Sequence, residues 1–382
     1  MGDFKSVIHC PVLTFMRGGN PYKHRQLAEV CPKRPVFPLY APGTLVLHAP
    51  FGLLPFDAAA RAFAAWTVVL TVLMAYLAFR VNDLMPTKVG VIAVAALVLL
   101  SRPGQWNLLM GNLAVELTVA TYIALYYARR SPLTSAIGLA VATIKPTFGV
   151  PLAILMVARR DYRAVALGVV FSLLLNLPPW LVLVKRAGGL DQFAQSLIES
   201  QQGWGAIVAS SSVTTAYRAD LTGFLSRLAG HPLGSPAEVL VALLVLLAAA
   251  IAIRTLEQQT EPARRRLSSD IACVAIVLGV YHLGYDLVLL TAPAIALALR
   301  TLPHGFATER FRRVMLLLIA GLGANYLTSE AVLVHLWEHR LVWLLLASIN
   351  GVLLLALFLG YVTRSLRLGG AREFVGPPPL TL

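Results

Sequence analysis

The sequence is poor in charged residues and in cysteine, and it has none of the common nucleotide-binding motifs. Charged residues make up 13% of the 382 residues and hydrophobic ones 58%, which excludes an ordinary soluble domain. The three cysteines lack metal-ligand spacing, and for Cys10 and Cys31 both a disulfide and free thiols remain open. No Walker loop, no G-x-G-x-x-G entering a helix, no H-E-x-x-H and no G-x-S-x-G is present, which argues against nucleotide-dependent soluble chemistry.

Long hydrophobic runs dominate what is present, and the mean hydropathy is +0.73. Because barrels give weaker, alternating signals, these runs predict an all-α, polytopic helical membrane protein. The net charge of +14 comes largely from basic residues in short loops between the runs, on every second turn. This alternation follows the positive-inside rule and predicts about eleven membrane passes, several of them short or broken. The charge therefore indicates topology and contact with anionic lipid, and we expect no nucleic-acid partner.

The same pattern divides the chain into loops and membrane segments. Residues 1–57 are rich in proline, glycine and aromatic residues and are predicted to form an outer-face loop with turns. The other parts are transmembrane helices over 58–184, an outer loop with short amphipathic helices over 185–236, transmembrane helices over 237–363 and a cytoplasmic tail over 364–382.

The run from Leu133 to Ala158 is apolar except for Lys145, which is followed at once by Pro146. A lysine inside the membrane is costly and usually faces a polar cavity, and proline disfavours helix at the residue before it. Arginines flank both ends, so both ends are predicted to be cytoplasmic and the run forms a broken hairpin. Each arm would reach roughly 18–20 Å, short of the ~30 Å hydrocarbon core, which places Lys145 in the outer leaflet. We favour phosphate binding by Lys145 over a lysine that snorkels to an interface.

The run from Ile271 to Leu299 also lies between two basic loops and is predicted to be a second two-armed excursion. Its middle contains His282 and Asp286, which are four residues apart and share one face of a helix. Three interpretations remain open: acid–base chemistry, an aspartate that orients the imidazole, or a structural hydrogen-bonded pair. The topology places further polar residues on this outer side, namely Asp3, Tyr40, Arg102 and Gln105. Glu116 lies on an apolar helix and is expected to face a polar partner inside the protein.

Several stretches together resemble glycosyltransferase family 87. They are Asp3–Tyr22, Phe37–Phe56, Ser101–Asn112, Ile144–Ala164 and Tyr281–Pro293. The resemblance implies a GT-C fold membrane enzyme, similar to bacterial mannosyltransferases that use polyprenyl-phosphate mannose. It implies inverting transfer of a sugar, with mannose favoured, to an acceptor hydroxyl on a glycolipid or glycan at the outer face of a bacterial plasma membrane. The lipid-linked sugar would be a substrate, and we expect no metal or other cofactor.

The resemblance also assigns residue roles. The family's general base is an aspartate upstream of a G-x-x-P-Y-like segment, here Gly18–Tyr22, which points to Asp3. Lys145, with Arg102 and His282, would hold the donor phosphate. The supporting residues would be Tyr40, Gln105, Asn112 and Asp286, with Asn112 standing where the family usually has glutamine. A membrane helix precedes the aspartate in the family, so we expect one upstream of Met1 in the intact gene or a truncated, non-catalytic copy.

A lipid or solute transporter, including a flippase, is the main alternative. Broken helices and an intramembrane cation are also typical of transporters. A transporter is expected to have inverted repeats and a site at the midplane, whereas the polar residues here are predicted to lie toward one face. Flux of a labelled substrate across vesicles without a covalent product would favour transport.

Overall fold

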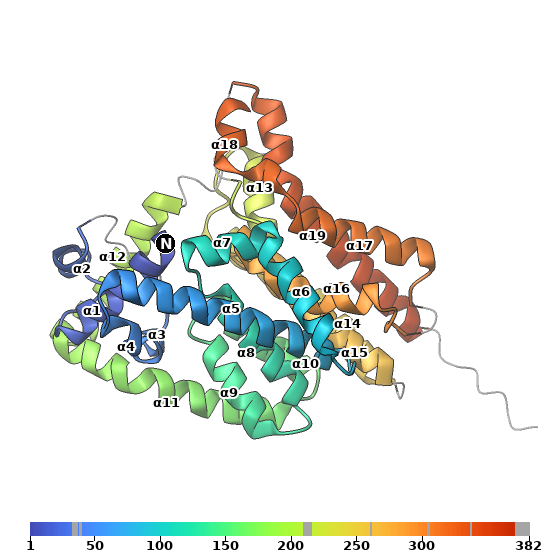
Figure 1. Ribbon diagram of the computed structural model, residues 1–382, viewed down its shortest axis with the longest axis horizontal. Helices are drawn as coiled ribbons and strands as arrows, with labels where there is room; N and C mark the ends of the chain where they lie inside the picture. The colour runs from blue at the N-terminus through green and yellow to red at the C-terminus, as the bar shows by residue number, and fades with distance from the viewer. Residues whose placement is uncertain are drawn as a thin grey trace, which may run out of the picture.

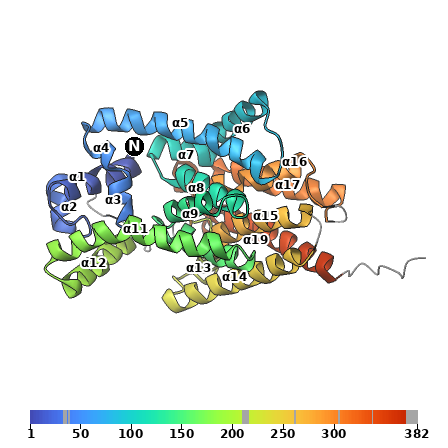
Figure 2. The same ribbon diagram turned by 90° about the horizontal axis from the view of Figure 1, so that it is seen from below.

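The computed structural model describes residues 1–32, 37, 40–208, 216–259, 262–303, 306–336 and 338–370. Residues 371–382 of the predicted cytoplasmic tail lie outside the described part. Within it every regular element is a helix, apart from one isolated β-bridge, which confirms the all-α prediction. Helices α1 to α4 and α12 gather at one end of the molecule, and α17 lies at the other end in both views (Figures 1 and 2).

The N-terminal segment is built from short helices, and this corrects the predicted loop over residues 1–57. Its elements are η1 (Phe4–His9), α1 (Cys10–Met16), α2 (His24–Val30), α3 (Gly43–Leu47) and α4 (Ala49–Gly52). Cys10 and Cys31 form a disulfide that ties α1 to the end of α2. Each helix has only one or two turns, and proline and glycine interrupt the segment between them. Aromatic and aliphatic side chains, among them Phe4, Ile8, Tyr22, Phe37 and Leu45, form its buried core.

Four helices are long and apolar enough to cross a membrane. They are α5 (Phe56–Val81), α11 (Tyr162–Ala187), α14 (Ser235–Glu257) and α19 (Arg340–Gly370). Helices α6 (Lys88–Leu100) and α7 (Arg102–Met110) pass the same test as a pair, bent by 74° at Ser101. Ser101 caps α7 by accepting a hydrogen bond from the Gly104 N–H, so the bend is a helix start as well as a break.

Shorter helices fill the space between the long ones. They are α8 (Ala114–Tyr127), α9 (Pro132–Ala142), α10 (Pro146–Ala158), α15 (Pro262–Gly279), η2 (Gly284–Leu290), α16 (Thr291–Ala298) and α17 (Glu309–Gly323). In Figure 2, α8 and α9 lie between α5 and the pair formed by α11 and α14. Among the described residues, four spans, or five with the bent pair, are long enough to cross a membrane. The prediction of about eleven passes relies on the shorter helices and stays a prediction.

The remaining elements belong to the loops. Helix α12 (Leu190–Val208) lies in the predicted outer loop over 185–236 and is longer than the short amphipathic helices expected there. The others are α13 (Leu221–Ala229), η3 (Tyr326–Thr328), α18 (Glu330–Leu333) and η4 (Val334–Leu336).

The predicted break at Lys145 is confirmed. Helix α9 ends at Ala142, and Lys145 is extended, with φ −113° and ψ 101°, immediately before α10. The two arms touch at Gly149, where a Cβ atom would lie 2.5 Å from Cα of Thr143. Since real Cβ atoms essentially never come that close to backbone, the sharp turn requires glycine at this position. The second excursion is also broken, between Gly279 and Gly284, so that His282 lies outside regular helix.

Candidate active site

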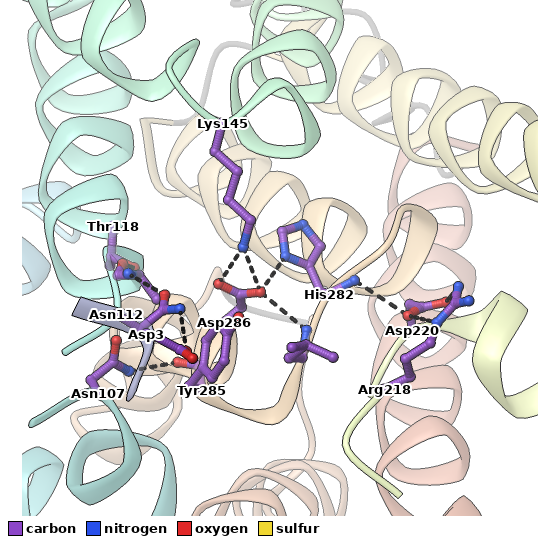
Figure 3. A network of polar contacts seen from close by, with 12 residues as sticks. Asp3, Asn107, Asn112, Thr118, Lys145, Arg218, Asp220, His282, Tyr285 and Asp286 are labelled. Atoms are coloured by element: carbon purple, nitrogen blue, oxygen red, sulfur yellow. Dashed lines mark hydrogen bonds and ion pairs between the residues drawn. The ribbon is translucent and has the colours of Figure 1, made fainter. Parts of the chain in front are cut away.

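The two breaks face each other, and an ion pair joins them. Lys145 donates from Nζ to both carboxylate oxygens of Asp286, each at 2.9 Å, and Figure 3 shows the side chains pointing toward one another. Lys145 is 7% exposed and Asp286 is fully buried. A buried charge is tolerated when it is paired, so each residue explains the presence of the other. Lys145 therefore points into the protein interior and does not snorkel to an interface.

His282 lies on the other side of Asp286, and the contact expected from their spacing is present. Its Nδ1 is 2.9 Å from Oδ2 of Asp286, which also accepts from the Leu283 N–H at 3.1 Å. Because an ionised carboxylate only accepts hydrogen bonds, Nδ1 carries a proton. Phe148 packs edge-on against the imidazole, with ring centroids 4.7 Å apart. Among the residues that the structure describes, buried Nε2 of His282 has no hydrogen-bond partner, which leaves it available to a ligand.

Asp3 reaches this cluster from the start of the chain. Asn112 donates from Nδ2 to Oδ2 of Asp3 at 3.1 Å. Gly111 ends α7 in a left-handed conformation, with φ +72°, and its missing side chain lets η1 approach, because a Cβ there would lie 2.5 Å from Cβ of Phe4. Burial raises the pKa of Asp3 above its ordinary value, opposed by the hydrogen bond from Asn112 and the charge of Lys145. Asp3 and Lys145, far apart in sequence, thus lie within electrostatic reach of each other.

Tyr40 joins the same cluster. It is buried, and its phenol lies close enough to Asp286 and Asp3 for their charges to act on it, adding to the rise in the pKa of Tyr40 that burial causes. Its backbone carbonyl accepts a hydrogen bond from the Tyr22 hydroxyl. The next residue along the chain, Ala41, donates to the carbonyl of Ile144 at 2.8 Å, which anchors Tyr40 beside the broken hairpin.

Arg102 and Gln105 lie elsewhere. The Arg102 guanidinium donates to the carbonyl of Asn325 and the hydroxyl of Thr328, and it lies over the Trp106 ring, with 5.5 Å from Cζ to the centroid. Gln105 donates from Nε2 to the carbonyl of Leu100 at 3.3 Å. Arg102 thus contacts the C-terminal segment, and Gln105 contacts the end of α6. The structure does not bring them to the ion pair, and their predicted donor-phosphate and supporting roles stay predictions.

Sequence reasoning missed a second charged pair that supports His282. Arg218 donates to both carboxylate oxygens of Asp220, from Nε at 3.0 Å and from Nη2 at 2.8 Å. Oδ2 of Asp220 in turn accepts from the His282 N–H at 3.3 Å, and Arg218 forms an isolated antiparallel bridge with Leu283. Burial alone would raise the pKa of Asp220, but Arg218 overcomes this effect and holds that pKa below its ordinary value. The only signal was the close spacing of opposite charges in a stretch where no motif stands out.

The expected polar partner of Glu116 is His48. Nε2 of His48 is 3.2 Å from Oε2 of Glu116, and Nδ1 is 2.9 Å from the carbonyl oxygen of Thr44. Both ring nitrogens of His48 therefore lie next to acceptor oxygens, and His48 is the polar partner of Glu116. In the described part of the chain, no group of three or more histidine, cysteine or acidic side chains is placed to hold a metal ion.

These features define a helical membrane protein with a buried polar site where short helices break. The model of glycosyltransferase family 87 matches residues 39–280, and the chain belongs to this family of membrane glycosyltransferases, as the sequence resemblance predicted. The match includes Lys145 and ends just before His282, and Asp3 lies outside it. No curated protein and no solved structure matches the chain.

Proposed function

We propose that this protein transfers a sugar, with mannose the favoured one, from a polyprenyl-phosphate donor to an acceptor hydroxyl of a glycolipid or glycan, with inversion. The observation that carries the proposal is that a carboxylate, an ammonium group and an imidazole with an unpartnered nitrogen lie around the buried carboxylate of Asp286. They belong to Asp3, Lys145 and His282, which come from three distant parts of the chain (Figure 3).

The ammonium of Lys145 supports phosphate binding because it retains donor capacity. A lysine has three N–H donors, and the two hydrogen bonds to Asp286 leave one for a ligand. Nε2 of His282 offers a second contact on the other side of Asp286 when the ring is protonated. A positive charge in a low-dielectric site stabilises the charge that grows on a departing phosphate far more than it would in water.

Asp3 is the proposed general base. Its carboxylate would take the proton of the acceptor hydroxyl as the hydroxyl oxygen forms a bond to the anomeric carbon. The bond from that carbon to the phosphate oxygen breaks in the same step, and polyprenyl phosphate leaves beside Lys145. The raised pKa makes Asp3 a better proton acceptor than an ordinary aspartate, which favours this role.

We place the site on the outer face of a bacterial plasma membrane. The disulfide between Cys10 and Cys31 supports this orientation, because disulfides form and persist in oxidising compartments and Asp3 lies on the same N-terminal segment. The clusters of arginine lie at the opposite ends of the short central helices, in keeping with the positive-inside rule.

The test is reconstitution of the purified full chain in vesicles with labelled polyprenyl-phosphate mannose and a glycolipid acceptor. We expect a covalent glycosylated product, and we expect Asp3→Asn to lower kcat by about 10²–10⁴-fold, the usual contribution of a general base. Asp57→Asn is the matched control, because Asp57 is exposed on the first turn of α5 and lies outside the site. Flux of the lipid-linked sugar without any product, or full activity of Asp3→Asn, would overturn the proposal.

A further inference from the structure

A cavity of about 150 Å³ lies at the far end of the helices that carry the candidate active site. Helix α8 (Ala114–Tyr127) begins two residues after Asn112 and ends two residues before Arg129. Helix α10 (Pro146–Ala158), which contacts α8, lies between Lys145 and Arg159. Each helix is about 20 Å long at 1.5 Å per residue, so the cavity is too distant to serve the sugar-transfer site. Its walls include four arginines and one aspartate, namely Arg129, Arg130, Arg159, Arg266 and Asp83.

The arginines of this cavity exceed the carboxylates that contact them. Asp83 accepts from Arg130 at 2.5 Å and from Arg266 at 3.2 Å. Arg129 binds two further carboxylates, Asp161 at 3.0 Å and Glu257 at 2.6 Å. A fourth carboxyl, that of Asp270, lies near Arg266, but burial raises the pKa of Asp270 to about 8, so it is largely uncharged at neutral pH. Set against the other three carboxylates, the four arginine side chains leave an excess of one positive charge.

Arg159 has hydrogen-bond donors that these carboxylates do not satisfy. It is 6% exposed, and its Nη1 has no hydrogen-bond partner among the described residues. Its Nη2 makes only a 3.4 Å contact with the carbonyl of Leu125, and its Nε lies 3.3 Å from Asp161. Nε of Arg266 likewise has no partner within the described part of the chain. Buried guanidinium donors are normally satisfied, so these atoms are available to an added acceptor.

We propose that this cavity binds a phosphate group, either on the headgroup of an anionic phospholipid or as free inorganic phosphate. Arginine is the preferred residue for phosphate because its planar fork of donors matches the phosphate oxygens, and the Ser269 side chain also lines the cavity. One phosphate balances the excess charge and supplies acceptors to Arg159 and Arg266. Asp83, whose carboxyl is 38% exposed, already holds two of the arginines and competes with the phosphate for them.

The test uses the purified full chain in detergent, with native mass spectrometry as the readout for lipid. We expect dioleoyl phosphatidylglycerol to be retained in preference to dioleoyl phosphatidylcholine. Arg266→Gln is expected to weaken retention by about tenfold, the usual value of a charge-assisted hydrogen bond. Asp83→Asn is expected to strengthen it, because it removes the competing carboxylate. Arg313→Gln is the control, since Arg313 is 72% exposed and lies outside the cavity.

A second arm distinguishes the source of the phosphate. Inorganic phosphate is compared with chloride at matched ionic strength for its effect on the Tm of the wild type, Arg266→Gln and Arg313→Gln. A shift that Arg266→Gln abolishes supports binding of free phosphate, whereas lipid retention without a shift supports a phospholipid site. The proposal is overturned if neither probe binds, or if Arg266→Gln and Arg313→Gln behave alike. Neither arm depends on sugar transfer, so the outcome is independent of the proposed function.

Discussion

The side-chain amide of Asn112 donates a hydrogen bond to the carboxylate of Asp3 at 3.1 Å, across 109 residues of sequence. It is a direct hydrogen bond to the candidate base. An amide donor stabilises the ionised carboxylate, so it opposes the rise in the pKa of Asp3 that burial causes. Asn112 is thus placed to lower the basicity of Asp3.

The first prediction concerns pH dependence. A general base acts only when ionised, so transfer is expected to fall as the pH drops through the pKa of Asp3. Asn112→Ala removes an effect that lowers this pKa, and the acid limb of kcat/KM is therefore expected to move to higher pH. Asn112→Gln keeps the amide and should leave the limb near its original position. An unchanged limb in Asn112→Ala would show that Asp3 does not control the rate.

A second prediction separates the structural role of the ion pair from its role in binding. Lys145→Met leaves Asp286 buried without its cation and is expected to lower the free energy of unfolding by about 3–5 kcal/mol. The double variant Lys145→Met/Asp286→Asn has no buried charge at this position, so its Tm should recover most of the loss. Sugar transfer should remain lost in the double variant. Recovery of transfer together with Tm would mean that Lys145 serves only the fold.

The third prediction tests the Arg218–Asp220 ion pair, which accepts a hydrogen bond from the backbone of His282. Asp220→Ala leaves Arg218 buried without its main partner and removes the acceptor of the His282 N–H. Breaking a buried pair is expected to cost about 3–5 kcal/mol in chemical denaturation. Glu238→Gln removes the other, 39% exposed partner of Arg218 and should change stability by less than about 1 kcal/mol. Equal effects of the two substitutions would contradict the assignment.

A fourth prediction concerns the N-terminal disulfide. Cys31→Ser should lower stability by about 3 kcal/mol, the value expected for closing a loop of this size. In the wild type, maleimide should modify one thiol after denaturation without reductant, namely Cys273, and all three after reduction. Three reactive thiols in protein purified without reductant would show that the pair does not form in the cell.

Local chemistry made the broken hairpin predictable, but its partner was not. A proline and a charge within an apolar run act on their own neighbourhood, so the break at Lys145 could be predicted without the fold. The ion pair with Asp286 joins residues 141 positions apart, and no periodicity records such a contact. The alternation of basic loops predicted that both residues lie on the same side of the membrane. It could not predict which residues contact each other there.

The same limit explains why contacts of Arg102, Arg218 and Asp220 could not be predicted from the sequence. Arg102 was placed by its side of the membrane alone, and the bend between α6 and α7 then directed it to Asn325. Nothing in the local sequence indicated the role of Arg218 and Asp220, because that role depends on their contact with the distant residue His282. The short helices of residues 1–57 were missed because one or two turns are too brief for helical periodicity to stand out.

Gly149 allows the two arms of the hairpin to pack closely and so determines where Lys145 lies. A single methyl group at this position would press against the backbone of Thr143 and wedge apart the two arms of the hairpin. Lys145 lies at the break between those arms, so separating them would shift its ammonium group away from Asp286. The position of the Lys145 ammonium in the interior of this enzyme thus depends on the absence of a Cβ atom at residue 149.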